Sequence, residues 1–368
     1  MKILILALSG IGDALMFTPA LRLLKQGLPE SQIDVLVMFG GAKEIFRNNP
    51  NINNVIHFNF LKEGAFKSLK FVLSLRNKYD AIVNVYPSNR KEYNLISLLI
   101  GAKHRVAAEY LRMNRENLGW LNNITVKEDD SMHNVQTNIR MIEKLIEKVA
   151  HKKINFYDAE EINLELNFGE DDLNFAENFL SEKKISSKDL VIGFHPGCAT
   201  LKNHIKRRWE PEKFSLLANK LIDKYSAKIL VFGGPEESEL KKEVRNNIQS
   251  ENALEIETGT LLQSAAIMKR CNLFITNDSA LMHIASALQL PVVAIIGPTN
   301  TNYIHPWKTK HTIASLKLEC SPCFFYSPRP LSCKRDDVKF KCIKELSVDL
   351  VFAEANKFIS EIAESKQF

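Results

Sequence analysis

The chain has 368 residues, more than one hydrophobic core usually holds, so two domains of ordinary size are expected. Hydrophobic residues make up 45% and charged residues 25% of it, which are globular values and argue against a disordered or fibrous chain. The net charge of +6 is unevenly spread, because an acidic stretch at residues 160–172 precedes a cationic one at 202–208. Such a cationic run is usually a solvated surface, and an anionic small molecule or a membrane surface is the alternative.

No exported or membrane-spanning segment is expected. Residues 3–8 are apolar but are followed by Ser9 and Gly10, and this run is shorter than the core of a signal peptide. No apolar run approaches the roughly 20 residues that cross a bilayer. Any contact with a membrane is therefore expected to be peripheral.

Apolar strand-like runs alternate with amphipathic helical stretches along the chain. In the first half, strands are predicted at residues 3–8, 33–38 and 81–85, and helices at 14–26, 42–48 and 91–100. In the second half, strands are predicted at 190–194, 228–232, 273–276 and 292–296, and helices at 211–224, 236–248, 261–269 and 280–288. This alternation predicts parallel sheets with helices on their faces, hence an α/β chain of two doubly wound, Rossmann-like halves. The halves join between about residues 167 and 188, where a helix is predicted at 171–182, and a closing helix is predicted at 348–364.

Ligands of open α/β sheets bind beyond the carboxyl ends of the strands, so two such domains facing one another would form a central cleft lined by these loops. The candidate motifs all fall there: Ser9-Gly10-Ile11-Gly12-Asp13, His195-Pro196-Gly197, Gly233-Gly234-Pro235, Asn277-Asp278-Ser279 and Gly297-Pro298-Thr299.

The segment Asn277-Asp278-Ser279 is the most informative of these. Its residue types favour a helix start, so the first N–H groups of the helix opened by Ala280 would face a ligand such as a diphosphate. An ordinary helix cap is the alternative. His283 lies one turn further on, either near this phosphate site or in helix packing.

The first loop does not have the glycine pattern of a dinucleotide-binding site, because Leu15 stands where a third glycine is needed. The carboxylate of Asp13 would repel a pyrophosphate there. This position suits a general base, and the alternative is that Asp13 only caps the helix.

His195, Pro196 and Gly197 end a strand shortly before the cationic residues Lys206 and Arg207. Open backbone and positive charge suit a leaving diphosphate, although a lone histidine such as His195 is more often a packing residue. For Gly233 and Thr299, simple turn chemistry is as good an interpretation as ligand contact.

Four cysteines cluster near the end of the chain: Cys320, Cys323, Cys333 and Cys342. A structural zinc ion, disulfides or free buried thiols are all compatible with this spacing, because only one CxxC pair is present.

Taken together, the motifs resemble glycosyltransferase family 9, the heptosyltransferase family of lipopolysaccharide core synthesis. The resemblance rests on Gly12-Asp13, Thr18-Pro19-Ala20-Leu21, His195-Pro196-Gly197, Lys206-Arg207-Arg208-Trp209, Gly233-Gly234-Pro235, Thr276-Asn277-Asp278-Ser279, Met282-His283 and Gly297-Pro298-Thr299, in the family's order. It implies a GT-B fold with an acceptor domain at 1–170, a nucleotide-sugar domain at 188–346 and a closing helix at 347–368. No metal or other cofactor is expected to be required for catalysis.

The resemblance also implies roles for individual residues. Asp13 would be the general base, and Lys206 or Arg207 would stabilise the leaving diphosphate. The donor-binding set would be Gly12, His195, Pro196, Gly197, Gly233, Asn277, Asp278, Ser279, Ala280, His283 and Thr299. The chain departs from the family where Arg207 replaces a lysine two residues before Trp209 and Ala280 replaces a glycine.

The resulting hypothesis is an inverting, cytoplasmic glycosyltransferase that uses a nucleotide sugar, ADP-heptose, and an anionic lipid-linked saccharide acceptor at the inner membrane face. Arg90, Lys91 and Arg112 are candidates for acceptor contacts, with solvated surface as the alternative. No nucleic-acid partner is expected. A nucleotide-sugar epimerase of the same architecture and a non-catalytic nucleotide-sugar-binding protein are the competing readings.

Overall fold

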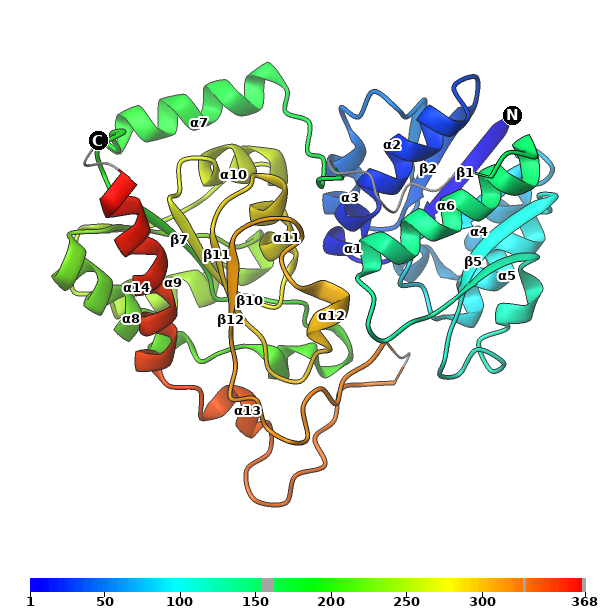
Figure 1. Cartoon of the computed structure of the whole chain (residues 1–368). Coiled ribbons are helices and arrows are strands. Elements are labelled where there is room, and N and C mark those ends of the chain that lie inside the picture. The colour runs from blue at the N-terminus through cyan, green and yellow to red at the C-terminus, as the bar shows by residue number, and fades with distance from the viewer. Residues whose placement is uncertain (154–161, 327–328, 366–368) are drawn as a thin grey trace. The chain divides into compact units, whose positions relative to one another are not determined.

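The computed structural model describes residues 1–153, 162–326 and 329–365 (Figure 1). The chain forms two compact units. Unit 1 consists of Met1–Asn167 together with Asn302–Ile304 and Tyr326, and unit 2 contains Phe168–Thr301, His305–Phe325 and the residues from Arg329 onward. The short helix α12 (Thr301–Ile304) spans a change from one unit to the other.

Unit 1 is built on a six-stranded sheet in the order β3-β2-β1-β4-β5-β6, and every neighbouring pair of strands is parallel. Its strands are β1 (Lys2–Ala7), β2 (Gln32–Val37), β3 (Asn54–His57), β4 (Ala81–Asn84), β5 (His104–Glu109) and β6 (Ile124–Lys127). Its helices are α1 (Ile11–Met16), α2 (Thr18–Gly27), α3 (Gly40–Phe46), α4 (Phe60–Ser74), α5 (Lys91–Ile100) and α6 (Asn134–Ala150), with the 3₁₀ turn Gly119–Leu121. One face packs against α4 and α5 through a core that includes Leu4, Leu6, Val72 and Ile96.

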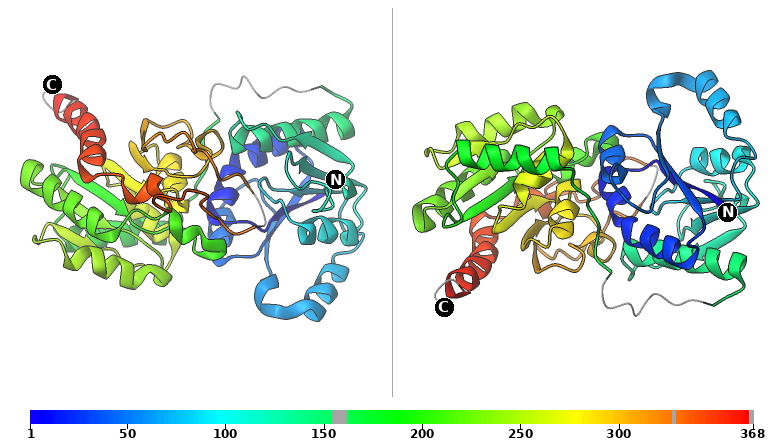
Figure 2. Two further views of the ribbon diagram at one scale, coloured as in Figure 1. Left: turned by 90° about the horizontal axis from the view of Figure 1, so that it is seen from below. Right: turned by 90° about the horizontal axis from the view of Figure 1, so that it is seen from above.

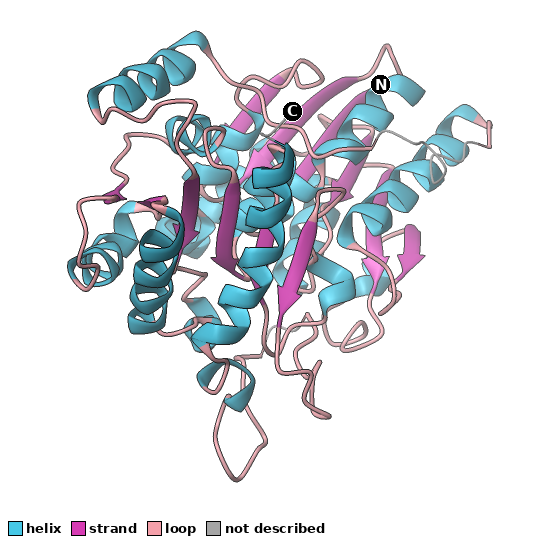
Figure 3. Cartoon of the chain, turned by 60° about the vertical axis from the view of Figure 1, so that its left-hand side comes forward, coloured by secondary structure: helices cyan, strands magenta, loops and turns pink. Residues whose placement is uncertain are grey.

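Unit 2 repeats this plan with the strand order β12-β11-β10-β7-β8-β9, again all parallel. Its strands are β7 (Val191–His195), β8 (Lys228–Val231), β9 (Ala253–Glu255), β10 (Leu273–Asn277), β11 (Val292–Ile295) and β12 (His311–Ala314). Its helices are α7 (Glu170–Glu182), α8 (Pro211–Tyr225), α9 (Ser238–Asn246), α10 (Leu261–Met268), α11 (Ala280–Ala287), α13 (Lys341–Lys344) and α14 (Val348–Ser365), with 3₁₀ turns at Leu201–Arg207 and Pro235–Glu237. Helices flank the strands on both faces (Figure 3).

The two sheets share one topology, because numbering the strands of each unit from its own first strand gives the order 3-2-1-4-5-6 in both. This is the order of a doubly wound sheet, in which the chain adds strands first on one side of the first strand and then on the other. Such sheets bind ligands in the crevice at this reversal point. In unit 1 the reversal lies between β1 and β4, and in unit 2 between β7 and β10. The predicted α/β class with two Rossmann-like halves is confirmed.

One predicted helix is wrong in its extent. Residues 14–26 were expected to form a single helix, but the chain makes α1 and then α2 with a break at Phe17. Pro19 lies in the first turn of α2, where its missing N–H costs nothing, and it could not continue a helix begun before it. The hydroxyl of Thr18 donates to the carbonyl of Leu15 at 2.7 Å and so closes the break.

None of the helices in the described ranges is long and apolar enough to cross a bilayer.

Candidate functional site

The candidate site of unit 2 is the reversal point of its sheet, where the loops after β7 and β10 meet. His195 pairs in register with Thr276 on the neighbouring strand, so the residues that follow each strand emerge side by side. The buried amide of Asn277 joins these loops, since its Nδ2 donates to the carbonyl of Pro196 at 2.7 Å and its Oδ1 accepts from the N–H of Trp209 at 3.0 Å. Asn277 therefore fixes the backbone around the site.

Trp209 anchors the cationic segment that precedes it. Its side chain is fully buried in the unit 2 core, and its Nε1 donates to the carbonyl of Leu346 at 2.9 Å. The preceding segment, Leu201–Arg207, is irregular because Lys202 and Asn203 adopt positive φ. Of the two candidate cations in this segment, Lys206 is exposed, whereas Arg207 is mostly buried.

Arg207 and Asp278 form a buried ion pair at the start of α11. The Arg207 Nη1 donates to Asp278 Oδ2 at 2.5 Å, and the side chains are 11% and 7% exposed. Thr299, from the loop after β11, donates its hydroxyl to the same oxygen at 2.7 Å. Three loops that are far apart in the sequence thus converge on one carboxylate.

His195 lies at the centre of a second polar network. Its Nδ1 is 2.8 Å from the hydroxyl of Ser279, and its Nε2 is 3.0 Å from Glu237 Oε2. Burial alone would raise the pKa of Glu237, but the charge of His195, its hydrogen bond and further donors outweigh burial and hold that pKa below its usual value. Ser279 is the N-cap residue of α11, yet its side chain contacts His195 and Thr276 and makes no capping bond.

Two residues of this network escaped the sequence analysis. Glu237 contacts His195, and Arg208 Nη2 lies 3.3 Å from Glu237 Oε1. Two glycines make room for Glu237 in the structure, because a Cβ at Gly197 would lie 1.8 Å from Glu237 Oε1 and one at Gly233 would lie 3.1 Å from Oε2. Glycine at these positions lets the loops approach each other closely.

His283 is buried one turn into α11, beside Ala280 at its start. Burial lowers the pKa of His283 to about 4, so the ring is neutral at physiological pH. Its Nδ1 has no hydrogen-bond partner among the described residues. This placement suits the packing role left open by the sequence.

The candidate site of unit 1 is the reversal point between β1 and β4. Asp13 lies in the first turn of α1, where its Oδ2 accepts from the N–H of Gly10 at 3.0 Å, and both Gly12 and Asp13 are partly exposed. The hydroxyl of Ser9, after β1, donates to the carbonyl of Pro87, after β4, at 2.5 Å and so joins the two loops at the reversal point. The capping role that the sequence left open is therefore present, and it holds Asp13 at the carboxyl end of β1.

The three basic residues suggested for acceptor contacts have different surroundings. Burial raises the pKa of Tyr93 to about 12. The negative charge of Asp13 also raises this pKa and the positive charge of Arg90 lowers it, so both residues lie near the Tyr93 ring. Lys91 is exposed at the start of α5. Arg112 instead makes a two-bond ion pair with Asp130, at 2.9 and 2.6 Å.

Two short segments from late in the sequence complete unit 1 next to Asp130. The hydroxyl of Tyr303 also donates to Asp130. The ring of Tyr326 stacks on Tyr303 at 5.1 Å, and its hydroxyl accepts from Asn134 at 2.8 Å. These contacts explain why Asn302–Ile304 and Tyr326 belong to unit 1.

The four clustered cysteines lie near one another in unit 2. Burial raises the pKa of Cys342 to about 11, with smaller contributions from Cys323, Cys333 and Cys320. All six cysteines are free thiols. Over the described ranges no group of three or more His, Cys, Asp or Glu side chains is arranged to hold a metal ion.

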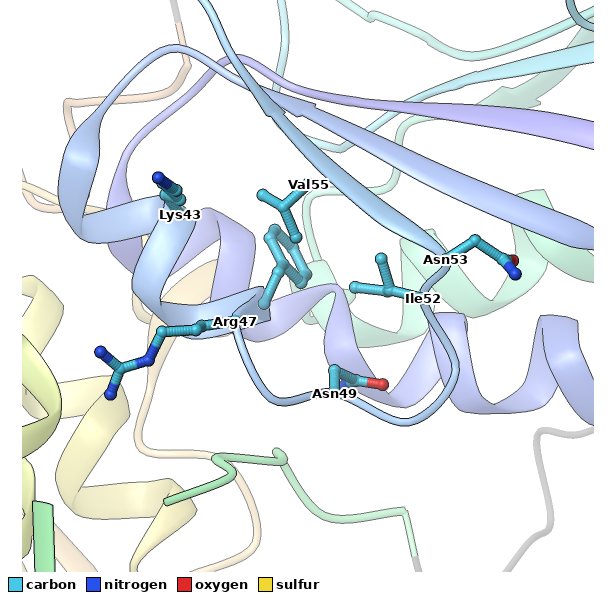
Figure 4. A pocket seen from close by; sticks show the side chains of 7 residues that line it. Lys43, Arg47, Asn49, Ile52, Asn53 and Val55 are labelled. Atoms are coloured by element: carbon cyan, nitrogen blue, oxygen red, sulfur yellow. The ribbon is translucent and has the colours of Figure 1, made fainter. Parts of the chain in front are cut away.

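A pocket of about 240 Å³ lies elsewhere in unit 1, between α3 and the start of β3. Figure 4 shows Lys43 on α3, Arg47 just after α3, Ile52 in the loop before β3 and Val55 on β3 among the residues that line it. It adjoins the amino end of β3, whereas ligands of such sheets bind at the carboxyl ends. We therefore assign no part of the site to it.

Comparison with known proteins agrees with this architecture. The sequence profile described as glycosyltransferase family 9 (heptosyltransferase) matches residues 68–330. The chain is similar to lipooligosaccharide heptosyltransferase 2 of Campylobacter jejuni, with 27% identity over 370 residues that cover 97% of this chain and 99% of that protein.

Two solved structures are also similar to it. One is the glycosyl transferase family 9 protein of Veillonella parvula, with a TM-score of 0.75 and 22% identity over 98% of this chain and 97% of that one. The other is ADP-heptose lps heptosyltransferase II of Escherichia coli, with a TM-score of 0.71 and 22% identity over 99% of this chain and all 100% of that one. These likenesses show the fold, GT-B, with two Rossmann-like units.

Proposed function

Since the chain belongs to glycosyltransferase family 9, the heptosyltransferase family, it is a glycosyltransferase, and we propose that it transfers a heptose from ADP-heptose to a lipopolysaccharide- or lipooligosaccharide-core acceptor. Similar proteins that are named lipooligosaccharide heptosyltransferase 2 and ADP-heptose lps heptosyltransferase II support the choice of sugar and acceptor. The observation that carries the proposal is the convergence of Arg207, Asp278 and Thr299 at the reversal point of the unit 2 sheet.

The donor's diphosphate is proposed to bind at this convergence. The first N–H groups of α11 carry the positive end of the helix dipole, which favours an anionic group there. Next to them lie the guanidinium groups of Arg207 and Arg208, which are paired with Asp278 and Glu237. Planar guanidinium groups suit phosphate oxygens because they can donate two parallel hydrogen bonds.

Asp278 is proposed to act on the donor through Arg207. Its carboxylate holds the guanidinium and the Thr299 hydroxyl in one geometry, so little rearrangement is needed when charge develops on the leaving group. The same reasoning selects Arg207 rather than exposed Lys206 as the cation nearest the departing diphosphate. His195 and Glu237 support Ser279 at the start of α11 from the other side.

Asp13 is proposed as the general base of an inverting, single-displacement transfer. The acceptor hydroxyl oxygen forms a bond to the anomeric carbon while the bond from that carbon to the diphosphate oxygen breaks. Asp13 takes the hydroxyl proton, and ADP leaves with the bonding electron pair. Its partly exposed position at the carboxyl end of β1 supports this role. Arg90, whose charge acts on the same tyrosine as that of Asp13, is proposed to bind an anionic group of the acceptor.

Calorimetry with ADP-heptose, ADP, UDP and GDP tests the proposal. We expect the wild-type protein to bind ADP-heptose and ADP more tightly than the other nucleotides, and Asp278→Ala to weaken both on the order of tenfold, as expected when a buried charge pair is broken. Unchanged affinity of Asp278→Ala would remove the assigned donor site. Tighter binding of UDP or GDP would leave the site but overturn the choice of donor.

A further inference from the structure

Most of the exposed large hydrophobic side chains of the described chain lie on two neighbouring helices of unit 1. Phe66 on α4 is 82% exposed and Leu61 is 62% exposed. Together these side chains form what we call the α4–α5 apolar surface: Leu61, Phe66, Leu69, Leu73, Leu95, Leu98 and Leu99. Single exposed leucines are ordinary on protein surfaces, whereas a group of this size indicates an interaction surface.

Helix α4 has two apolar sides. Phe71, Val72 and Leu75 face the unit 1 core. Phe66, Leu69 and Leu73 are three and four residues apart, so they form a row on another side of the helix. Figure 2 shows α4, in light blue, standing out from the rest of unit 1. The core therefore accounts for only one of its two apolar sides.

Helix α5 continues the surface. Ile96 and Ile100 enter the same core as Val72, whereas Leu95, Leu98 and Leu99 point outward. The segment after α4 is tied to the end of α5, because the N–H of Asn77 donates to the carbonyl of Ile100 at 2.8 Å. The exposed residues of both helices thus belong to one region of unit 1.

Basic residues accompany this surface. Lys62, Lys67 and Lys70 are exposed on α4, and the following exposed residues include Arg76 and Lys78. Lys91 and Lys103 are exposed at the two ends of α5. The acidic residues of the two helices are Glu63, which pairs with Lys67 at 3.2 Å, and Glu92. The region therefore carries net positive charge around its apolar side chains.

We propose that the α4–α5 apolar surface and its lysines dock unit 1 onto the anionic face of a lipid bilayer. The assignment rests on the proposed function, in which the acceptor is lipid-linked. A helix with exposed Phe and Leu flanked by Lys lies in the bilayer interface with the apolar side chains among the acyl chains and the ammonium groups at the headgroups. Charge complementarity selects an anionic bilayer over an uncharged one.

Sedimentation with lipid vesicles tests the proposal, using the full-length protein and neither donor nor acceptor. Vesicles of phosphatidylcholine alone are compared with vesicles that also contain phosphatidylglycerol, at low and at high salt. We expect the wild type to bind the anionic vesicles and to lose most of that binding at high salt, because the electrostatic contribution is screened.

Two double variants separate the apolar and the electrostatic contributions. Phe66→Ser with Leu69→Ser, and Lys62→Gln with Lys70→Gln, are each expected to weaken binding on the order of tenfold. The matched controls are exposed residues of unit 2, Leu173→Ser with Leu216→Ser and Lys188→Gln with Lys242→Gln. We expect these controls to bind like the wild type, and all four variants to keep the wild-type melting temperature.

Three results would overturn the proposal: no binding of the wild type to anionic vesicles, equal loss in the control variants, or a wild-type dimer in size-exclusion chromatography that Phe66→Ser dissociates. The last result would assign the surface to a second copy of the chain. Because the vesicle assay contains no nucleotide sugar, its failure is distinct from failure of donor binding in calorimetry.

Discussion

The buried pair of Arg207 and Asp278 gives a quantitative prediction for unit 2. The two side chains are 11% and 7% exposed, and Asp278 also accepts from Thr299. Removing one partner of a buried ion pair typically costs 3–5 kcal/mol, because the other charge stays buried without its counter-charge. We therefore expect Asp278→Ala to lower the free energy of unfolding of unit 2 by about 3 kcal/mol.

A double-mutant cycle measured by urea unfolding isolates the pair. Arg207→Ala, Asp278→Ala and the double variant are expected to give a coupling energy of about 2 kcal/mol, within the range seen for contacting residues. The matched control is the Lys220–Asp349 pair of the same unit, whose side chains are 48% and 81% exposed. Exposed pairs contribute little, so its coupling is expected to stay below about 0.5 kcal/mol.

Comparison of the two coupling energies tests whether burial controls the Arg207–Asp278 interaction. If the coupling of Arg207 with Asp278 were no larger than that of Lys220 with Asp349, burial would not control this interaction. The claim that Asp278 holds Arg207 in place for the donor would then be wrong.

Three further predictions concern residues around the sites. Gly197→Ala places a Cβ 1.8 Å from Glu237 Oε1, so the carboxylate that contacts His195 has to shift and ADP affinity should fall on the order of tenfold in calorimetry. Gly234→Ala, which has nothing within 4 Å, should change ADP affinity less than about twofold. Burial lowers the pKa of His283 to about 4, so between pH 6.5 and 4 the unfolded chain binds more protons than the folded one, and the free energy of unfolding should fall by about 3 kcal/mol as the pH falls through that window. In urea unfolding at pH 7, 5 and 4, His283→Gln should show a smaller fall than the wild type, and an equal fall in the two proteins would contradict this prediction. Exposed Cys320 and Cys323 should react with a thiol reagent in the native protein. Cys198 and Cys271 are buried, with pKa values raised to about 11 and about 12, and should react only after unfolding; equal reaction rates of all four thiols in the native protein would refute this prediction.

The fold was readable from the sequence wherever strands are buried on both faces. The strands β1, β4, β7, β10 and β11 are mostly apolar and almost wholly buried, because parallel strands covered by helices have no polar side. The edge strands β3, β6, β9 and β12 are short and have partly exposed residues, as does the inner strand β5, and these five strands were not predicted.

Two long helices, α4 and α6, were not predicted. The helix α4 carries apolar residues on both its inner and its outer side, which hides the usual one-sided pattern. The helix α6 has a readable pattern, since Val135, Ile139, Ile142 and Ile146 recur at helical spacing and are all buried.

Sequence patterns located the loops of the site but not the contacts within it. Loops after successive parallel strands meet at one edge of a sheet, so His195, Asn277 and Thr299 could be grouped in advance. The partners of each side chain could not, because they depend on local backbone geometry. The positive φ of Lys202 and Asn203 turns Arg207 inward and leaves Lys206 outside, and nothing in the sequence marks Glu237 as the partner of His195.

The most direct test of the account is the transfer rate of Asp13→Asn at saturating ADP-heptose, measured alongside ADP-heptose affinity by calorimetry. Asparagine keeps an oxygen that can accept from the N–H of Gly10, so the start of α1 should persist. The account predicts a rate lower by about 10²–10⁴-fold, the usual contribution of general base catalysis, with donor affinity within about twofold of the wild type. A variant that transfers sugar at the wild-type rate would contradict it.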